Sequence, residues 1–133
     1  MEKIFYKNAL IGIKLSAMPR GSVSHTDGKQ SLELLTLKHP KGTYLKAHVH
    51  IPRKRITRHL QECFIVRKGK VRVDLYGPDK NLFKHIYLKA GELFIALTGG
   101  HGFHVMEDVE MIELKNGPFK DDKDFIEETK NQI

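Results

Sequence analysis

A pair of histidines separated by a single residue, His48 and His50, could bind a metal ion or transfer a proton. His48-Val49-His50 closes a segment, residues 43–50, in which Thr, Leu, Ala and Val alternate with Tyr, Lys and His. Alternation with a period of two predicts a β-strand, and residues i and i+2 of a strand project from the same face. Both imidazoles should therefore point the same way, and two neutral imidazoles make half of a site for a divalent ion such as Fe, Mn, Ni or Zn.

The elements that must position these histidines are predicted to be strands. Apolar residues alternate or cluster in residues 7–15, 31–38, 62–66, 71–76, 82–88, 93–97, 102–106 and 109–114, with turn residues between them. Short strands at intervals of about 8–12 residues predict an all-β sandwich, jelly roll or barrel. Only residues 121–130, with acids in the first turn, predict a helix. A chain of 133 residues, 40% hydrophobic and 29% charged, is expected to form one domain, 1–133.

The histidine pair belongs to a longer pattern of glycine, histidine and glutamate. The pattern runs Gly42, five residues, His48-Val49-His50, an 11-residue gap, Glu62, six residues and Gly69. A second pattern runs from Gly91 to His101-Gly102-Phe103. These stretches, about 42–69 and 91–105, resemble the two motifs of the cupin family. The gap before Glu62 is longer than the family usually has, and Ala96 stands where the second motif has proline.

The resemblance implies a fold and a metal site. The fold would be the double-stranded β-helix, a jelly-roll barrel, here followed by the short C-terminal helix. One divalent ion would be held by His48, His50, Glu62 and His101, with His104 as the alternative to His101. A metal held by three imidazoles and one carboxylate keeps open positions for substrate or water. Cupins commonly pair through N-terminal strands, so we expect a homodimer.

Two further side chains share the strand face of the histidine pair. If the alternation holds, Tyr44 and Lys46 line the same cavity as His48 and His50. Tyr44 could act as a general acid or donate a hydrogen bond to a substrate oxygen, or it could be core filler with a satisfied hydroxyl. Lys46 could bind substrate or extend to the rim.

The positive charge is concentrated in one zone. The net charge is +7, but residues 41–72 hold ten Lys or Arg against one acid, whereas residues 101–133 hold four against nine. Arg53, Arg55 and Arg58 lie in the long gap, which the barrel would place at its mouth. Arginines there suit a phosphate or carboxylate ligand. The zone has no interleaved aromatics and no nucleic-acid motif, so we expect an anionic small molecule and no nucleic acid.

These observations lead to three functional hypotheses. The first is an isomerase or epimerase of surface-polysaccharide biosynthesis that acts on an anionic sugar or nucleotide sugar, with His48 or His50 moving a proton. The second is an iron-dependent dioxygenase of a small organic acid, and the third is a non-catalytic sugar- or metal-binding cupin. Residues 1–6 lack a signal-peptide pattern, and no apolar run approaches the roughly 20 residues needed to cross a bilayer. We therefore expect a cytoplasmic protein with no membrane partner.

Overall fold

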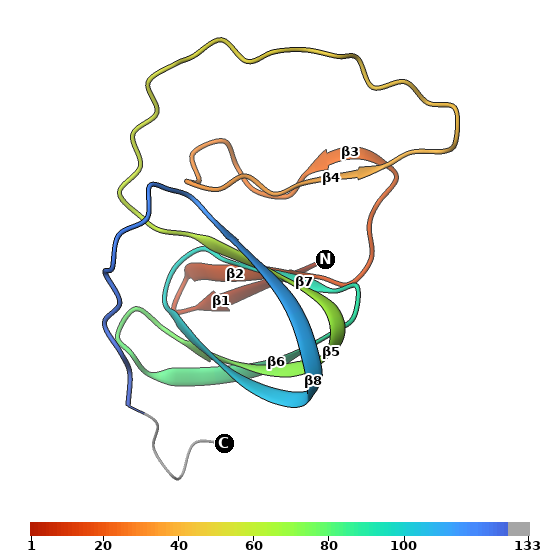
Figure 1. Ribbon diagram of the computed structural model, residues 1–133. Coiled ribbons are helices and arrows are strands. Elements are labelled where there is room, and N and C mark those ends of the chain that lie inside the picture. Colours follow the sequence, from red (N-terminus) through yellow and green to blue (C-terminus); the bar gives the residue numbers. More distant parts are fainter. Residues whose placement is uncertain (128–133) are drawn as a thin grey trace.

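The chain is all-β in the computed structural model, which describes residues 1–127 (Figure 1). Its strands are β1 (Glu2–Tyr6), β2 (Ala9–Leu15), β3 (Gly21–Ser24), β4 (Leu35–Lys38), β5 (Glu62–Tyr76), β6 (Leu82–Lys89), β7 (Leu93–Ala96) and β8 (Gly100–Lys115). Within the described residues there is no helix, and so none long and apolar enough to cross a membrane.

Six strands form one antiparallel sheet, and two form a separate hairpin. The large sheet has the order β1-β2-β7-β5-β6, with β8 pairing β5 on its other side, while β3 and β4 pair only with each other. The long strands β5 and β8 curl strongly, so the sheet bends into half of a barrel (Figure 1). Curling gives the sheet a concave face and an outer face.

Each face of the curled sheet packs its own apolar cluster. The concave face holds Ile4, Phe64, Val66, Val71, Val73, Leu75, Ile86, Leu88, Phe94 and Ala96. The outer face near the start of β5 holds Ile13, Cys63, Ile95 and Leu97, against which Leu32 and Leu34 pack from the segment before β4. Strand β5 therefore carries apolar residues on both faces in its first half, as a strand buried on both sides does.

The structure joins pairs of strands that the sequence pattern separates. Predicted strands 62–66 and 71–76 are both parts of β5, and predicted strands 102–106 and 109–114 are both parts of β8. The expected turn at Lys68-Gly69 is instead a bend within the ladder, where the register between β5 and β8 shifts three times. Bulges of this kind let a strand bend without ending. The strands predicted at 82–88 and 93–97 are confirmed as β6 and β7.

Residues 43–50 are not a strand, contrary to the alternation pattern. Residues 39–61 contain no helix or strand, and nearly all of them are exposed. A strand needs a neighbour for its backbone N–H and C=O groups, and no strand within residues 1–127 pairs with this segment. Its six Lys and Arg residues have no acid among them to offset their repulsion. An alternating pattern of apolar and polar residues is therefore not enough to form a strand when no neighbouring strand is present to pair with it.

Two other boundaries differ from the prediction. Of residues 31–38 only β4 is a strand, and β1 and β3 lie where the pattern was weak or absent. The predicted helix 121–130 is absent over residues 121–127, and residues 128–130 lie outside the described residues. The acids of residues 121–127 favour a helix N-terminus, but Phe125 is 82% exposed, so no apolar face packs to stabilise a helix there.

Gln61 fixes the end of the long segment 39–61 to the sheet. This side chain is 4% exposed and accepts a hydrogen bond from the Leu32 N–H at 2.9 Å. Its amide donates to Gln30 Oε1 at 2.6 Å, and its backbone N–H donates to Asn116 Oδ1 at 2.8 Å. The segment therefore enters β5 at a defined place, although most of its length is exposed.

Candidate functional site

Glu62 and His101 meet on the concave face of the sheet. His101 Nε2 lies 3.3 Å from Glu62 Oε1, and the two side chains are 22% and 17% exposed. In the ladder between β5 and β8, His101 pairs with Leu75 and Glu62 with Lys115, at opposite ends of β5. The curl of the two strands brings these ends together, and this contact joins two of the four predicted metal ligands.

Aromatic rings and charged groups surround this pair. The rings of Phe64 and His101 pack edge to face at 5.0 Å, and Phe64 packs in the same way on Phe103 at 4.7 Å. The hydrogen bond with His101 is the main reason that the pKa of Glu62 lies below its usual value, and it outweighs the opposing effect of burial. Glu62 is therefore held as a carboxylate, the form that accepts hydrogen bonds or binds a cation.

The other predicted site residues lie in the exposed segment 39–61. The rings of His48 and His50 are 4.9 Å apart, and His48 Nδ1 is 3.1 Å from the Lys46 carbonyl oxygen. The Tyr44 hydroxyl accepts a hydrogen bond from the Ala47 N–H at 3.3 Å, so it is used locally. Within residues 1–127, no contact joins these four predicted side chains to Glu62 or His101.

One of the three predicted arginines reaches the neighbourhood of Glu62. A cavity of about 230 Å³ is lined by Arg58, Glu62, Lys115 and Phe119, among others. Arg53 and Arg55 are exposed and do not line it. Lys115 Nζ is 3.2 Å from Glu113 Oε2 and 5.7 Å from the centre of the Phe119 ring. The cavity therefore has charges of both signs and one aromatic wall.

The donor chemistry suits a metal ion, but the donors are divided between two places. Among residues 1–127, no three His, Cys, Asp or Glu side chains lie close enough together to hold an ion. Glu62 and His101 supply one carboxylate and one imidazole, and His48 and His50 supply two imidazoles on a separate segment. A complete site of these four residues would require the segment to approach the sheet.

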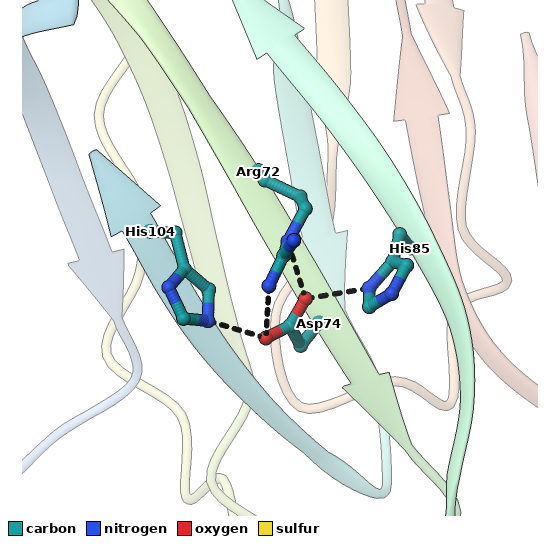
Figure 2. Close-up of polar contacts among 4 residues, drawn as sticks. All are labelled: Arg72, Asp74, His85 and His104. Carbon is teal, nitrogen blue, oxygen red and sulfur yellow. Dashed lines mark hydrogen bonds and ion pairs between the residues drawn. The ribbon is translucent and has the colours of Figure 1, made fainter. Parts of the chain in front are cut away.

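A second concentration of ionisable groups lies on the outer face, centred on Asp74 (Figure 2). This carboxylate is 2% exposed. Arg72 donates to it from Nε at 3.0 Å and from Nη2 at 3.4 Å, and His104 Nε2 is hydrogen-bonded to it at 2.7 Å. His85 Nδ1 lies 2.6 Å from Asp74 Oδ1, but neither nitrogen of this ring makes an aligned hydrogen bond within residues 1–127. Three neighbouring strands thus meet at one buried acid.

Sequence reasoning missed this cluster because its members are far apart in the chain. From the sequence alone, Arg72 and Asp74 are the polar residues of the predicted strand 71–76, and His85 is one histidine within the predicted strand 82–88. The available signal was the i, i+2 spacing of Arg72 and Asp74, which puts both on one face. The ladder register then places His85 opposite Asp74 and His104 opposite Arg72. His104 is consequently on the outer face, and His101 is the histidine that contacts Glu62.

The fold and these sites define an all-β protein with a curled antiparallel sheet and polar groups on both faces. Comparison of the chain with protein-family models, with curated proteins and with solved structures found no match.

Proposed function

We propose that this chain is a metal-binding protein of the cupin type whose barrel is completed when residues 43–50 join the free edge of β8. The observation that carries the proposal is the 3.3 Å contact between Glu62 and His101 on the concave face. In the completed site His48 and His50 would join this pair around one divalent ion. That ion would act as a Lewis acid and would keep open coordination positions for substrate.

The edge of β8 supports this closure. Among the described strands, β8 pairs only with β5, so its second edge has unpaired backbone groups that can template another strand. Val105 and Met106, near that edge, are 61% and 53% exposed, so apolar area is left to cover. Residues 100–115 also carry four acids against one lysine, opposite in sign to the basic segment.

Chain length permits the movement. Eleven residues separate His50 from Glu62. At about 3.3–3.6 Å per residue an extended stretch of that length spans roughly 35–40 Å, which is wider than a small barrel. The segment is anchored at its end, where Asn116 is hydrogen-bonded to Gln61, Thr57 and His59. Closure would therefore order a segment of which only the end is fixed, and metal binding would supply free energy to offset the lost chain entropy.

The proposed reaction is proton transfer on an anionic sugar or nucleotide sugar. Arg58 already lines the cavity beside Glu62, and closure would bring Arg53 and Arg55 toward the same mouth. Guanidinium groups would hold a phosphate or carboxylate, and His48 or His50 would move the proton. Tyr44 and Lys46 share the alternation of the two histidines and would face the same substrate. A homodimer is part of the proposal, and a monomer in analytical ultracentrifugation would contradict that part.

Metal titration tests the proposal directly. We expect wild type to bind one equivalent of Ni²⁺ or Mn²⁺ in isothermal titration calorimetry. Loss of a ligand in Glu62→Gln, His101→Gln or His50→Ala should weaken binding at least about tenfold, a lower bound taken from the 10–100-fold cost of losing a ligand's supporting partner. His39→Gln, at an exposed histidine remote from the proposed site, is the matched control and should bind as wild type. Unchanged metal content in His50→Ala would show that the proposed site is wrong.

Assays of the loaded and stripped protein separate the reaction classes. Exchange of a substrate C–H for deuterium in metal-stripped protein would indicate a proton-shuttling isomerase. Activity only with Fe(II) and dioxygen would indicate a dioxygenase instead. Binding without turnover would indicate a non-catalytic cupin.

A further inference from the structure

The outer face of β5, β6 and β8 carries more cationic groups than the Asp74 cluster alone. Facing outward are Lys70, Arg72 and Asp74 from β5, His85, Tyr87 and Lys89 from β6, and His104 and Glu107 from β8. Three permanent cations stand against two carboxylates, so the face is net positive with both imidazoles neutral. It gains one charge for each imidazole that is protonated.

Lys70 and Lys89 stand directly opposite each other on neighbouring strands. Like charges in this arrangement destabilise a sheet unless something lies between or above them. Lys70 Nζ lies over the Tyr87 ring, 5.1 Å from the ring centre, and Glu107 stands opposite Lys70 on β8. No carboxylate stands opposite Lys89 on β5, its one described neighbouring strand; the carboxylate near it is Glu92, which accepts a hydrogen bond from the Lys89 backbone N–H at 3.0 Å.

The hydrogen-bonding capacity of the two imidazoles is only partly used. Both ring nitrogens of His85 are buried without an aligned hydrogen-bond partner in the described structure. His104 uses Nε2 toward Asp74, while its side chain is 38% exposed and its Nδ1 makes no hydrogen bond within residues 1–127. Buried polar atoms in native proteins nearly always have partners, including bound water or ligands.

Space for a ligand exists beside the carboxylate. Gly102 stands opposite Asp74 on β8, and a Cβ added there would meet no atom of residues 1–127 within 4 Å. The surface between His104 and Gly100 therefore has no side chain over it from β8. A small group could approach Arg72 and His104 from this side without displacing atoms of the described residues.

We propose that this outer face binds a tetrahedral dianion of the phosphate type, held by Arg72 and His104. Asp74 orients the guanidinium and the imidazole from beneath, and its charge is already neutralised by Arg72. Protonation of His104 then turns Nδ1 into a donor toward the ligand while Nε2 stays bonded to Asp74. Lys70 and Lys89 add attraction from the side. The site is on the opposite face of the sheet from Glu62 and His101 and does not depend on the metal site.

Sulfate is the probe that isolates the role of the histidines. Its charge does not change between about pH 6 and pH 8, the range in which histidine ordinarily changes charge, so a pH effect must come from the protein. We expect sulfate, followed by NMR of the imidazole and backbone amide resonances, to bind at least about fivefold more tightly at the lower pH. The shifts should centre on His104, Arg72 and Gly102.

Variants test the assignment. His104→Gln and Arg72→Lys should each lose most of the sulfate affinity while keeping the wild-type melting temperature within a few degrees. His39→Gln, at an exposed histidine outside the cluster, should bind as wild type. Equal affinity in His104→Gln and wild type would overturn the proposal, and so would shifts confined to Arg53, Arg55 and Arg58.

The source of the dianion is decided by comparing inorganic phosphate with phenyl phosphate. Tighter binding of phenyl phosphate would assign the site to a phosphate monoester, with Tyr87 as the adjoining aromatic surface. Equal binding of the two would assign it to the free ion. Binding of neither at millimolar concentration would overturn the proposal.

Discussion

At the scale of single residues, Asp74 shows how a buried charge is tolerated in a small sheet. Burial alone would raise the pKa of this carboxyl. The hydrogen bonds from Arg72 and His104, together with the nearby His85, outweigh burial, so the pKa of Asp74 lies below its usual value. The residue is therefore an anion under physiological conditions and binds three strands together.

Replacing Asp74 with Asn should be strongly destabilising. The substitution removes the negative charge and leaves the partly buried Arg72 guanidinium and the buried His85 nitrogens without a counter-charge. Breaking a buried pair by removing one partner costs about 3 kcal/mol or more. Urea denaturation should report that loss. Asp108→Asn, at an exposed position, is the control and should change stability by less than about 0.5 kcal/mol.

The lowered pKa of Asp74 also predicts an acid-dependent loss of stability. In the unfolded chain the pKa of an aspartate is about 3.9, and the pKa of Asp74 in the folded protein is lower. Between these two pKa values the unfolded state therefore binds more protons than the folded state. The stabilisation is present above the unfolded pKa and is lost as pH falls through the folded pKa. Urea midpoints at about pH 5 and pH 3 should therefore fall more for wild type than for Asp74→Asn. Parallel falls would show that Asp74 does not carry this effect.

At the scale of the elements, Gly69 explains why β5 continues where the sequence predicts a turn. Its φ of 86° is in the left-handed region, and a Cβ there would overlap the carbonyl oxygen of Asp108 on β8. The absence of a side chain at Gly69 thus lets the backbones of β5 and β8 approach closely at the bulges. The prediction of a turn at Lys68-Gly69 is right that Gly69 has a left-handed backbone conformation. It is wrong that the chain reverses there, because β5 continues to Tyr76.

Substitution of two glycines separates backbone strain from steric overlap. Gly91 has a φ of 88°, and a Cβ there would meet nothing within 4 Å. Gly91→Ala should cost about 1 kcal/mol, the price of a left-handed alanine, whereas Gly69→Ala should cost at least about 2 kcal/mol because the backbone of β8 must also move. Thermal melts of the two variants make the comparison. Equal losses of stability in the two variants would contradict the close approach of the β5 and β8 backbones at Gly69.

At the scale of the whole molecule, the exposed basic segment 39–61 is the longest stretch of the described residues that has no helix or strand. We expect trypsin to cut first after Arg53, Lys54, Arg55 or Arg58, because local opening there requires little loss of packing. If the proposed closure occurs, saturating Ni²⁺ should slow these cuts at least about tenfold, since ordering the segment costs free energy that binding must supply. Mass spectrometry of the early fragments gives the positions.

The same digestion has an internal control. In His50→Ala, which lacks one proposed ligand, Ni²⁺ should give little protection, while cutting without metal should match wild type. Protection that is equal in both proteins would contradict closure through His50. First cuts within β5 or β8 would contradict the exposure of the segment.

The amino-acid sequence by itself determined the all-β class and the positions of β2, β6 and β7. The placement of Glu62 and His101 in one site follows only from the resemblance to the cupin motifs. Period-two patterns and turn residues are local signals, so they identify strands wherever a partner strand exists. Only the tertiary structure decided that residues 43–50 pair with no described strand and that β5 and β8 run through their predicted turns. It also decided that Asp74 contacts Arg72, His85 and His104. These outcomes depend on ladder register and on the curl of the sheet, which arise from contacts between residues far apart in the chain.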